Sequence, residues 1–221
     1  HKEYRRQRQM CIRDRRMVMS RSDVFRGTGP ASGTYSRIRM GAKNDGTIVA
    51  AEAEIYNQAG AFKGSPVGRS LDSFFSSYAI ENAKATAYDV CVNRPKVAAY
   101  RAPGAPMATL GAELTINEIA EKLNIDPIDL RLKNAVQDGG ESLCGVKYGR
   151  IGLNEVLETV KSHPHYLAPL KANQGRGFAL GYWMHGGGLS SVNANLLDDG
   201  TVSVATGNPD IGGSRSSMRV M

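Results

Sequence analysis

Residues 108–134 read ATLGAELTINEIAEKLNIDPIDLRLKN, and this stretch predicts two consecutive helices. In its first part, residues recur every three or four positions, as on one face of an amphipathic helix: Leu110, Leu114, Asn117, Ala120 and Leu123. We expect Glu113 to lie on the surface of this helix. In the second part, Asp126 is a typical N-cap and Pro127 a typical first helical residue. The pattern therefore predicts one helix over 108–123 and another that begins at Pro127.

Two stretches outside this helical region predict hairpins. Residues 34–41 and 47–62 alternate in character on either side of Asn44-Asp45-Gly46. Such a turn favours a hairpin, because Gly and its neighbours tolerate the positive φ that tight turns need. Asp198-Asp199-Gly200 repeats the pattern, so a second hairpin is predicted over about 189–206.

The remaining segments complete an α+β fold. Residues 83–100 predict a strand that is interrupted at Pro95 and in which Cys91 is buried. Residues 154–163 predict a further amphipathic helix that ends before Pro164. Because strands and helices do not alternate strictly, we expect mixed strands and hairpins packed with a few helices rather than a doubly wound parallel sheet.

The composition is that of an ordinary globular protein, with 41% hydrophobic and 22% charged residues in 221. No stretch approaches the roughly 18 consecutive apolar residues that a membrane helix requires, and no secretory signal is evident. The three cysteines are isolated and lack metal-ligand spacing. We therefore expect a cytoplasmic protein in a reducing compartment, with no membrane partner.

The net charge of +7 is concentrated at the N-terminus. Residues 1–16, HKEYRRQRQMCIRDRR, hold seven basic and two acidic residues, which leaves only +2 for the rest of the chain. A basic tail can bind phosphates, but the body has no basic stripe interleaved with aromatic residues. We interpret residues 1–16 as a non-native basic leader and expect no nucleic-acid partner.

Residues 99–107, AYRAPGAPM, place one arginine among small residues and two prolines. Proline fixes φ and removes a backbone donor, so we expect a rigid, extended loop in front of the helix over 108–123. Arg101 would then lie near a helix N-terminus, where anions are stabilised. The residues alone leave two roles open for Arg101, an anion-binding group or an ordinary surface residue.

Glycines gather late in the chain, at 175–188 and 206–214. The run Gly186-Gly187-Gly188, which follows His185, would let backbone N–H groups approach a ligand closely, whereas single glycines are better explained as turns. Neither a strand-GxGxxG-helix fingerprint nor a GxxxxGK[ST] loop is present. The pattern favours a polar cofactor and gives no support to nucleotide hydrolysis.

Four motifs in order resemble one enzyme family. VNRPKVAAYRAPGAP, AELTINEIAEKLNIDPIDLRLKNAV, GRGFALGYWMHGGGLSS and DDGTVSVATGNPDIGGSRSSM resemble the molybdenum-binding large subunit of the xanthine dehydrogenase, aldehyde oxidase and aerobic carbon monoxide dehydrogenase family. The resemblance covers roughly residues 17–221. It implies a first molybdopterin-binding region over 17–170 and the start of a second subdomain over 171–221.

The resemblance also implies chemistry, cofactors and partners. It implies hydroxylation of a small-molecule C–H bond by water at molybdenum held by molybdopterin cytosine dinucleotide. Electrons would leave through an iron–sulfur small subunit and an FAD medium subunit. The residues that match cofactor-proximal positions are Arg101, Ala102, Gly212 and Gly213, and those that match the substrate pocket are Arg69, Pro103, Tyr182 and Trp183. Core packing remains an alternative for the two aromatic residues.

Departures from the family pattern narrow the expected function. Ala102 stands where carbon monoxide-oxidising relatives have a copper-binding cysteine, so carbon monoxide is not expected as substrate. Pro103 replaces a stacking aromatic and Gly213 a glutamine of many xanthine-type enzymes, which favours an aldehyde or an N-heterocycle over a purine. The family's catalytic glutamate is expected beyond Met221. The chain alone is therefore expected to be inactive, and we assign it no catalytic or metal-ligating residue.

Two alternatives remain open at this point. The chain could be a non-enzymatic interaction module that retains the fold without the chemistry. It could also belong to a reductive member of the same family, which removes ring hydroxyl groups rather than adding them.

Overall fold

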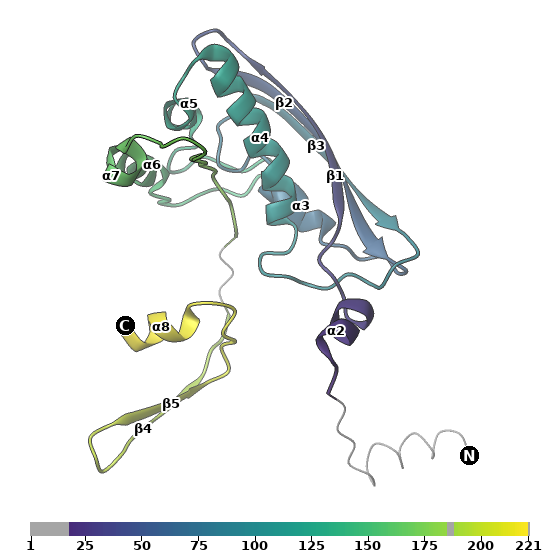
Figure 1. Ribbon diagram of the computed structural model, residues 1–221, viewed down its shortest axis with the longest axis vertical. Helices are drawn as coiled ribbons and strands as arrows, with labels where there is room; N and C mark the ends of the chain where they lie inside the picture. Colours follow the sequence, from purple (N-terminus) through teal and green to yellow (C-terminus); the bar gives the residue numbers. More distant parts are fainter. Residues whose placement is uncertain (1–17, 185–187, 221) are drawn as a thin grey trace.

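The computed structural model describes residues 18–184 and 188–220 (Figure 1). Its elements are α2 (Arg21–Gly27), β1 (Thr34–Ala42), β2 (Ile48–Gly60), α3 (Val67–Ser73), β3 (Asn82–Cys91), α4 (Ala105–Leu123), α5 (Pro127–Asn134), α6 (Leu153–Ser162), α7 (Pro164–Leu167), β4 (Val192–Leu196), β5 (Val202–Thr206) and α8 (Ser214–Val220). The α+β class predicted from the sequence is confirmed. None of the helices in these described ranges is long and apolar enough to cross a membrane.

A mixed three-stranded sheet forms the centre of the body. Strands β1 and β2 make the predicted antiparallel hairpin, and Gly46 in its turn has a φ of 85°. Strand β3 then pairs with β2 in parallel, which requires a crossover connection, and α3 lies in that connection. The sheet order is therefore β1-β2-β3.

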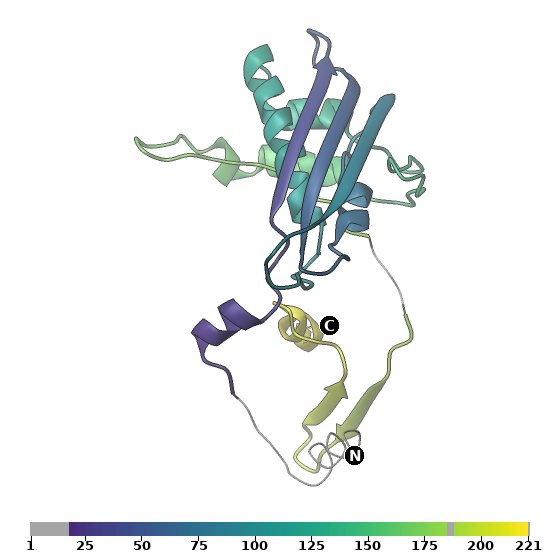
Figure 2. The same ribbon diagram turned by 90° about the vertical axis from the view of Figure 1, so that its right-hand side faces the viewer.

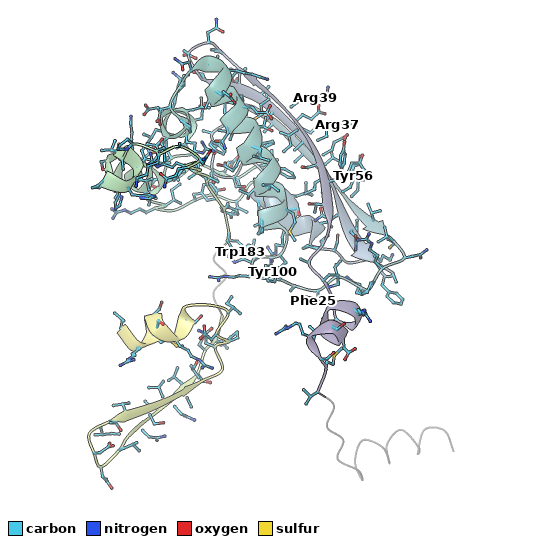
Figure 3. The ribbon with its side chains drawn as sticks, viewed as in Figure 1. Phe25, Arg37, Arg39, Tyr56, Tyr100 and Trp183 are labelled. Atoms are coloured by element: carbon cyan, nitrogen blue, oxygen red, sulfur yellow. The ribbon has the colours of Figure 1, made fainter. Side chains whose placement is uncertain are left out.

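In the part of the chain that the structure describes, helices cover one face of this sheet. Figure 2 shows the three strands in front of α3 and α4, and no helix or strand of residues 18–184 and 188–220 lies over the opposite face. Tyr35, Tyr56 and Tyr88 form a row across the open face, and the rings of Tyr56 and Tyr88 stack at 4.6 Å between centroids. Beside them Arg37 and Arg39 point away from α4 and pair with glutamates of β2 (Figure 3).

Helix α4 packs against the sheet through small residues. Its buried positions include Ala108 and Ala112, which meet Ala51 and Ala53 of β2. A side chain on Gly111 would approach the Ile38 Cδ1 atom to 2.7 Å. Helix and sheet therefore approach each other more closely than larger side chains would allow.

The helix itself and the burial of Ala120 were predicted correctly, but the N-terminal half of the predicted face was wrong. Leu110 and Leu114 are 64% and 54% exposed, whereas Glu113 is buried. The physical reason is the alanine-lined surface of β2, which accepts alanines of α4 and turns the leucines outward.

A second core cluster joins α4, α5 and α6. Ile116, Ile128, Leu130 and Leu157 are each fully buried in it, and Leu180 contributes from a segment without regular secondary structure. Helix α5 begins as predicted, because the Asp126 carboxylate accepts from the backbone N–H groups of Ile128 and Asp129.

Asn134, at the end of α5, holds the β1–β2 turn against the helices. Its side chain is buried, accepts from the Ile48 N–H at 2.8 Å and donates to the Gly46 carbonyl at 2.9 Å. The side-chain amide of Asn134 thus joins the turn to helix α5, with both its oxygen and its nitrogen hydrogen-bonded.

Two further predictions about this region need correction. The strand predicted over 83–100 ends at Cys91, and residues 92–100 are irregular because Pro95 cannot continue a ladder. Cys91 is exposed rather than buried, since it lies at the last position of the edge strand β3.

The C-terminal hairpin and the helix before it were predicted correctly. Strands β4 and β5 pair around Gly200, and α6 ends at Ser162, with His163 as its C-cap. In both ribbon views the hairpin stands apart from the three-stranded sheet (Figures 1 and 2).

We predict that Asn134→Ala lowers the free energy of unfolding by about 2 to 4 kcal/mol, because it leaves a buried N–H and a buried carbonyl without partners. Urea denaturation measures the change. Asn193→Ala is the control, since Asn193 is exposed in β4, and it should change stability by less than about 0.5 kcal/mol. Equal losses in the two variants would contradict the role given to Asn134.

A pH dependence follows from Asp45 in the same turn. The Thr47 backbone N–H, with a smaller contribution from Lys133, lowers the pKa of the Asp45 carboxyl to about 2. A lowered folded-state pKa stabilises the fold above the unfolded value of about 3.9, and that contribution disappears as the pH falls through about 2. NMR titration should give a midpoint near 2, and Lys133→Met should raise it only slightly. A midpoint near 4 in the unmodified chain would show that the turn does not hold the charged form.

Candidate functional site

The segment in front of α4 is a tight turn rather than an extended loop. Ala102 and Gly104 both have positive φ, at 56° and 97°, and α4 already begins at Ala105. Pro106 lies in the first helical turn, where its missing N–H has no cost because helix starts leave these donors unpaired. The helix therefore begins three residues earlier than the predicted start at 108. Pro103 is half-buried within the turn.

Gly104 fixes this turn against α3. A Cβ atom at Gly104 would lie 2.6 Å from the Pro66 carbonyl oxygen and 2.7 Å from the Ser70 nitrogen. The Ser70 hydroxyl donates to the Gly104 carbonyl at 3.2 Å, and the buried Asn57 amide donates to Ser70 at 3.0 Å. Strand β2, helix α3 and the turn are therefore locked together at the N-terminus of α4.

This contact brings Arg69 of α3 to the site. The Cβ atom of Arg69 also faces Gly104, at 2.8 Å from the position of an added Cβ. Its guanidinium pairs with Asp72 at 3.2 Å and contacts the Met184 sulfur. Arg69, which resemblance assigned to the substrate pocket, therefore lies against the segment that also carries Tyr182 and Trp183.

The two aromatic residues of that segment differ in their surroundings. The ring of Tyr182 packs on Tyr148, with 5.8 Å between centroids, which is an ordinary packing contact. Trp183 is 48% exposed, and it is labelled in Figure 3. His185 and the first two glycines of the triple-glycine run lie outside the described residues.

Arg101 reaches the second glycine-rich segment. Gly212 has a φ of 117°, and a Cβ atom there would lie 2.7 Å from the Arg101 Nη1 atom. The Gly212 N–H donates to Asp210 at 3.1 Å, and Gly213, with a φ of 84°, leads into α8 with open space around it. The structure therefore brings together Arg101 and Gly212, which lie far apart in the sequence.

A buried ion pair lies behind these segments, and the prediction for one of its members was wrong. Glu113, expected on the helix surface, is 4% exposed and accepts from the fully buried Arg131 at 2.7 Å. The Tyr78 hydroxyl also donates to Glu113, and burial, followed by the Glu113 charge, raises the pKa of Tyr78 well above its usual value. The sequence signal for this pair was an acid between Ala112 and Ile116, on the true buried face of α4.

The chemistry of the site is that of an anion-binding surface. Two guanidinium groups, Arg69 and Arg101, and turns with positive φ gather near the N-terminus of the 19-residue helix α4. Within residues 18–184 and 188–220, no three His, Cys, Asp or Glu side chains are grouped so as to hold a metal ion. These residues suit recognition of negatively charged oxygens.

We predict that Gly104→Ala lowers the free energy of unfolding by about 2 to 4 kcal/mol, because its Cβ would meet backbone atoms at a positive φ. Gly68→Ala is the matched control in α3. Nothing lies within 4 Å of that position, and its φ is not positive. Alanine there should stabilise the chain by about 0.5 to 1 kcal/mol. Thermal unfolding distinguishes the two, and a neutral Gly104→Ala would disprove the close approach.

Comparisons with known proteins agree on one family. Residues 9–135 match the family described as Molybdopterin cofactor-binding domain. The aldehyde oxidoreductase of Megalodesulfovibrio gigas is 28% identical in an alignment of 202 residues that covers 84% of this chain and 22% of the relative. The nicotinate dehydrogenase large molybdopterin subunit of Eubacterium barkeri is 29% identical over 150 residues, 66% of this chain and 35% of the relative.

A solved structure agrees with the sequence relatives. The crystal structure of the aldehyde oxidoreductase from Desulfovibrio desulfuricans superposes with a TM-score of 0.64 at 26% identity, over 80% of this chain and 21% of that chain. The chain thus spans between 22% and 35% of the length of the two curated relatives above. It belongs to the molybdopterin cofactor-binding domain family, as its resemblance to the large subunits of molybdenum hydroxylases predicted.

Proposed function

We propose that this chain is part of a molybdenum hydroxylase large subunit and helps to hold molybdopterin cytosine dinucleotide. The observation that carries the proposal is the approach of the Arg101 guanidinium to Gly212. It joins two segments, each of which resembles a cofactor-proximal segment of the family.

The residues present fit such a group. A molybdopterin dinucleotide carries phosphate oxygens, which guanidinium groups and free backbone N–H groups bind well. Glycine at position 212 leaves room that any side chain would fill, beside a cation that is exposed to a ligand. In this proposal Arg101 donates hydrogen bonds to the cofactor, while Ala102, Gly212 and Gly213 let it approach the backbone.

The bound cofactor would supply the oxidation of a substrate C–H bond with oxygen from water. The residues of this chain would bind and orient the substrate. Arg69 is a fixed cation, because Asp72 pairs with it and Met184 contacts it. Pro103, Tyr182 and Trp183 would border the same pocket.

The names of the relatives support the proposed substrate and partners. Two relatives are an aldehyde oxidoreductase and a nicotinate dehydrogenase, which supports an aldehyde or an N-heterocycle as substrate. Several relatives are named as molybdenum-binding or large molybdopterin subunits, which supports the existence of partner subunits. In this proposal these partners carry iron–sulfur clusters and FAD, as the family resemblance implies.

The test is cofactor content after expression in a host that makes molybdopterin cytosine dinucleotide. We expect the chain to retain molybdenum and pterin, and Arg101→Ala to lower both by about tenfold, since a charge-assisted hydrogen bond contributes about 1.5 kcal/mol or more. Metal analysis and fluorescence of the oxidised pterin measure them.

Arg101→Lys and Arg94→Ala are the controls. Lysine keeps the charge without the planar fork, so an intermediate content is expected. Arg94 is exposed in the irregular segment before the turn, and its removal should leave the content unchanged. A cofactor-free chain, or equal content in the chain and in Arg101→Ala, would overturn the proposal.

A further inference from the structure

Residues 178–184 carry part of the candidate pocket, yet they belong to no helix or strand. A segment without a ladder of backbone hydrogen bonds needs other contacts to keep one position. The best-defined of these contacts is the backbone N–H of Leu180, which donates to the Glu113 Oε2 atom at 2.7 Å in the buried interior.

Glu113 is itself held by the side chain of Arg131. The Arg131 Nε and Nη2 atoms lie 3.0 Å and 2.7 Å from the same Glu113 oxygen. The remaining guanidinium contacts are with Asn117 at 2.8 Å and with the Pro127 carbonyl at 2.9 Å. Every nitrogen of the guanidinium is thus hydrogen-bonded, and the carboxylate has little freedom to turn.

Arg131 also contacts the start of the segment. Its guanidinium lies over the Phe178 ring, 5.6 Å from the centroid. Phe178 and Leu180 are therefore held by the two members of one ion pair, and Met184, four residues further on, contacts Arg69. Residues 178–184 are thus held at one end by the buried pair and at the other by Arg69.

We propose that Glu113 and Arg131 are positioning residues that set residues 178–184, and with them Trp183 and Met184, against Arg69 and the turn in front of α4. Their relevance to substrate or cofactor rests on the proposed function, but the contact with Leu180 does not. An apolar pair of similar size could fill the same space, and only an acceptor can satisfy the Leu180 N–H.

The experiment separates this role from mere stabilisation. A single substitution such as Glu113→Leu leaves Arg131 as an unpaired buried charge and can unfold the chain. The informative variant of the 221-residue chain is therefore the double variant Glu113→Leu with Arg131→Met, in which no buried charge remains. Its melting temperature should lie above that of the single variant but below that of the unmodified chain, because the Tyr78 hydroxyl and the Leu180 N–H still lose their acceptor.

The readout is Leu180 amide hydrogen exchange relative to that of Ile48, because a loss of global stability alone would change both amides alike. In the double variant the Leu180 amide should exchange about ten- to a hundredfold faster, because it has lost a charged acceptor. The Ile48 amide, bound to Asn134 in the same core, reports general stability and should change clearly less than the Leu180 amide. The fluorescence anisotropy of Trp183, the single tryptophan, should fall in parallel.

Glu118→Gln is the matched control on the exposed face of α4, and it should leave both amides and the anisotropy unchanged. If Leu180 exchange in the double variant matches the unmodified chain, or changes only as much as Ile48, the positioning role is overturned. These measurements need no cofactor. If the Arg101 test fails, this inference still stands. If Leu180 exchange does not change as expected, the proposed function still stands.

Discussion

The buried ion pair between Glu113 and Arg131 is the constraint on which the arrangement of this chain depends. Removing two charges from water has a large cost, which only full hydrogen bonding and close geometry can offset. The pair meets that requirement by drawing on Tyr78, Asn117 and the Leu180 N–H, which come from different parts of the chain. Loops that would otherwise be free to move are thereby bound to α4 and α5.

The other constraint is the close contact between α4 and the sheet. Alanines on both surfaces let the helix lie near the strands, and Gly104 lets its first turn touch α3. The position of the helix start therefore follows from packing around it, and the arginine just before it is presented at a defined place. The packing of α4 against the sheet and α3 thus also fixes the position of the candidate binding surface.

Local signals in the sequence predicted individual helices and hairpins. Nonlocal contacts decided which face of α4 is buried and how β3 pairs. Asp126 and Pro127 start a helix by themselves, and Asn44-Asp45-Gly46 makes a hairpin turn, so both were predictable. The buried face of α4 was not, because it depends on alanines of β2 and on Arg131. The parallel pairing of β3 likewise depends on a crossover that no local pattern encodes. Arg101 and Gly212 were found through family resemblance, since nothing in their local sequences relates them.

The contacts of Glu113 also differ in sequence separation, that is, in the length of the loop that each contact closes. Arg131 lies 18 residues from it, Tyr78 lies 35 and Leu180 lies 67 residues away. The entropic cost of closing a loop rises with its length, by about 0.6 kcal/mol for each doubling. The helical hairpin of α4 and α5 therefore brings the charges together most easily, and the Leu180 contact closes the longest loop. During synthesis from the N-terminus, Tyr78, Glu113 and Arg131 are all made before Leu180, so the contact among these three residues can form before residues 178–184 arrive. The pair thus offers a prepared acceptor to a segment that is made later.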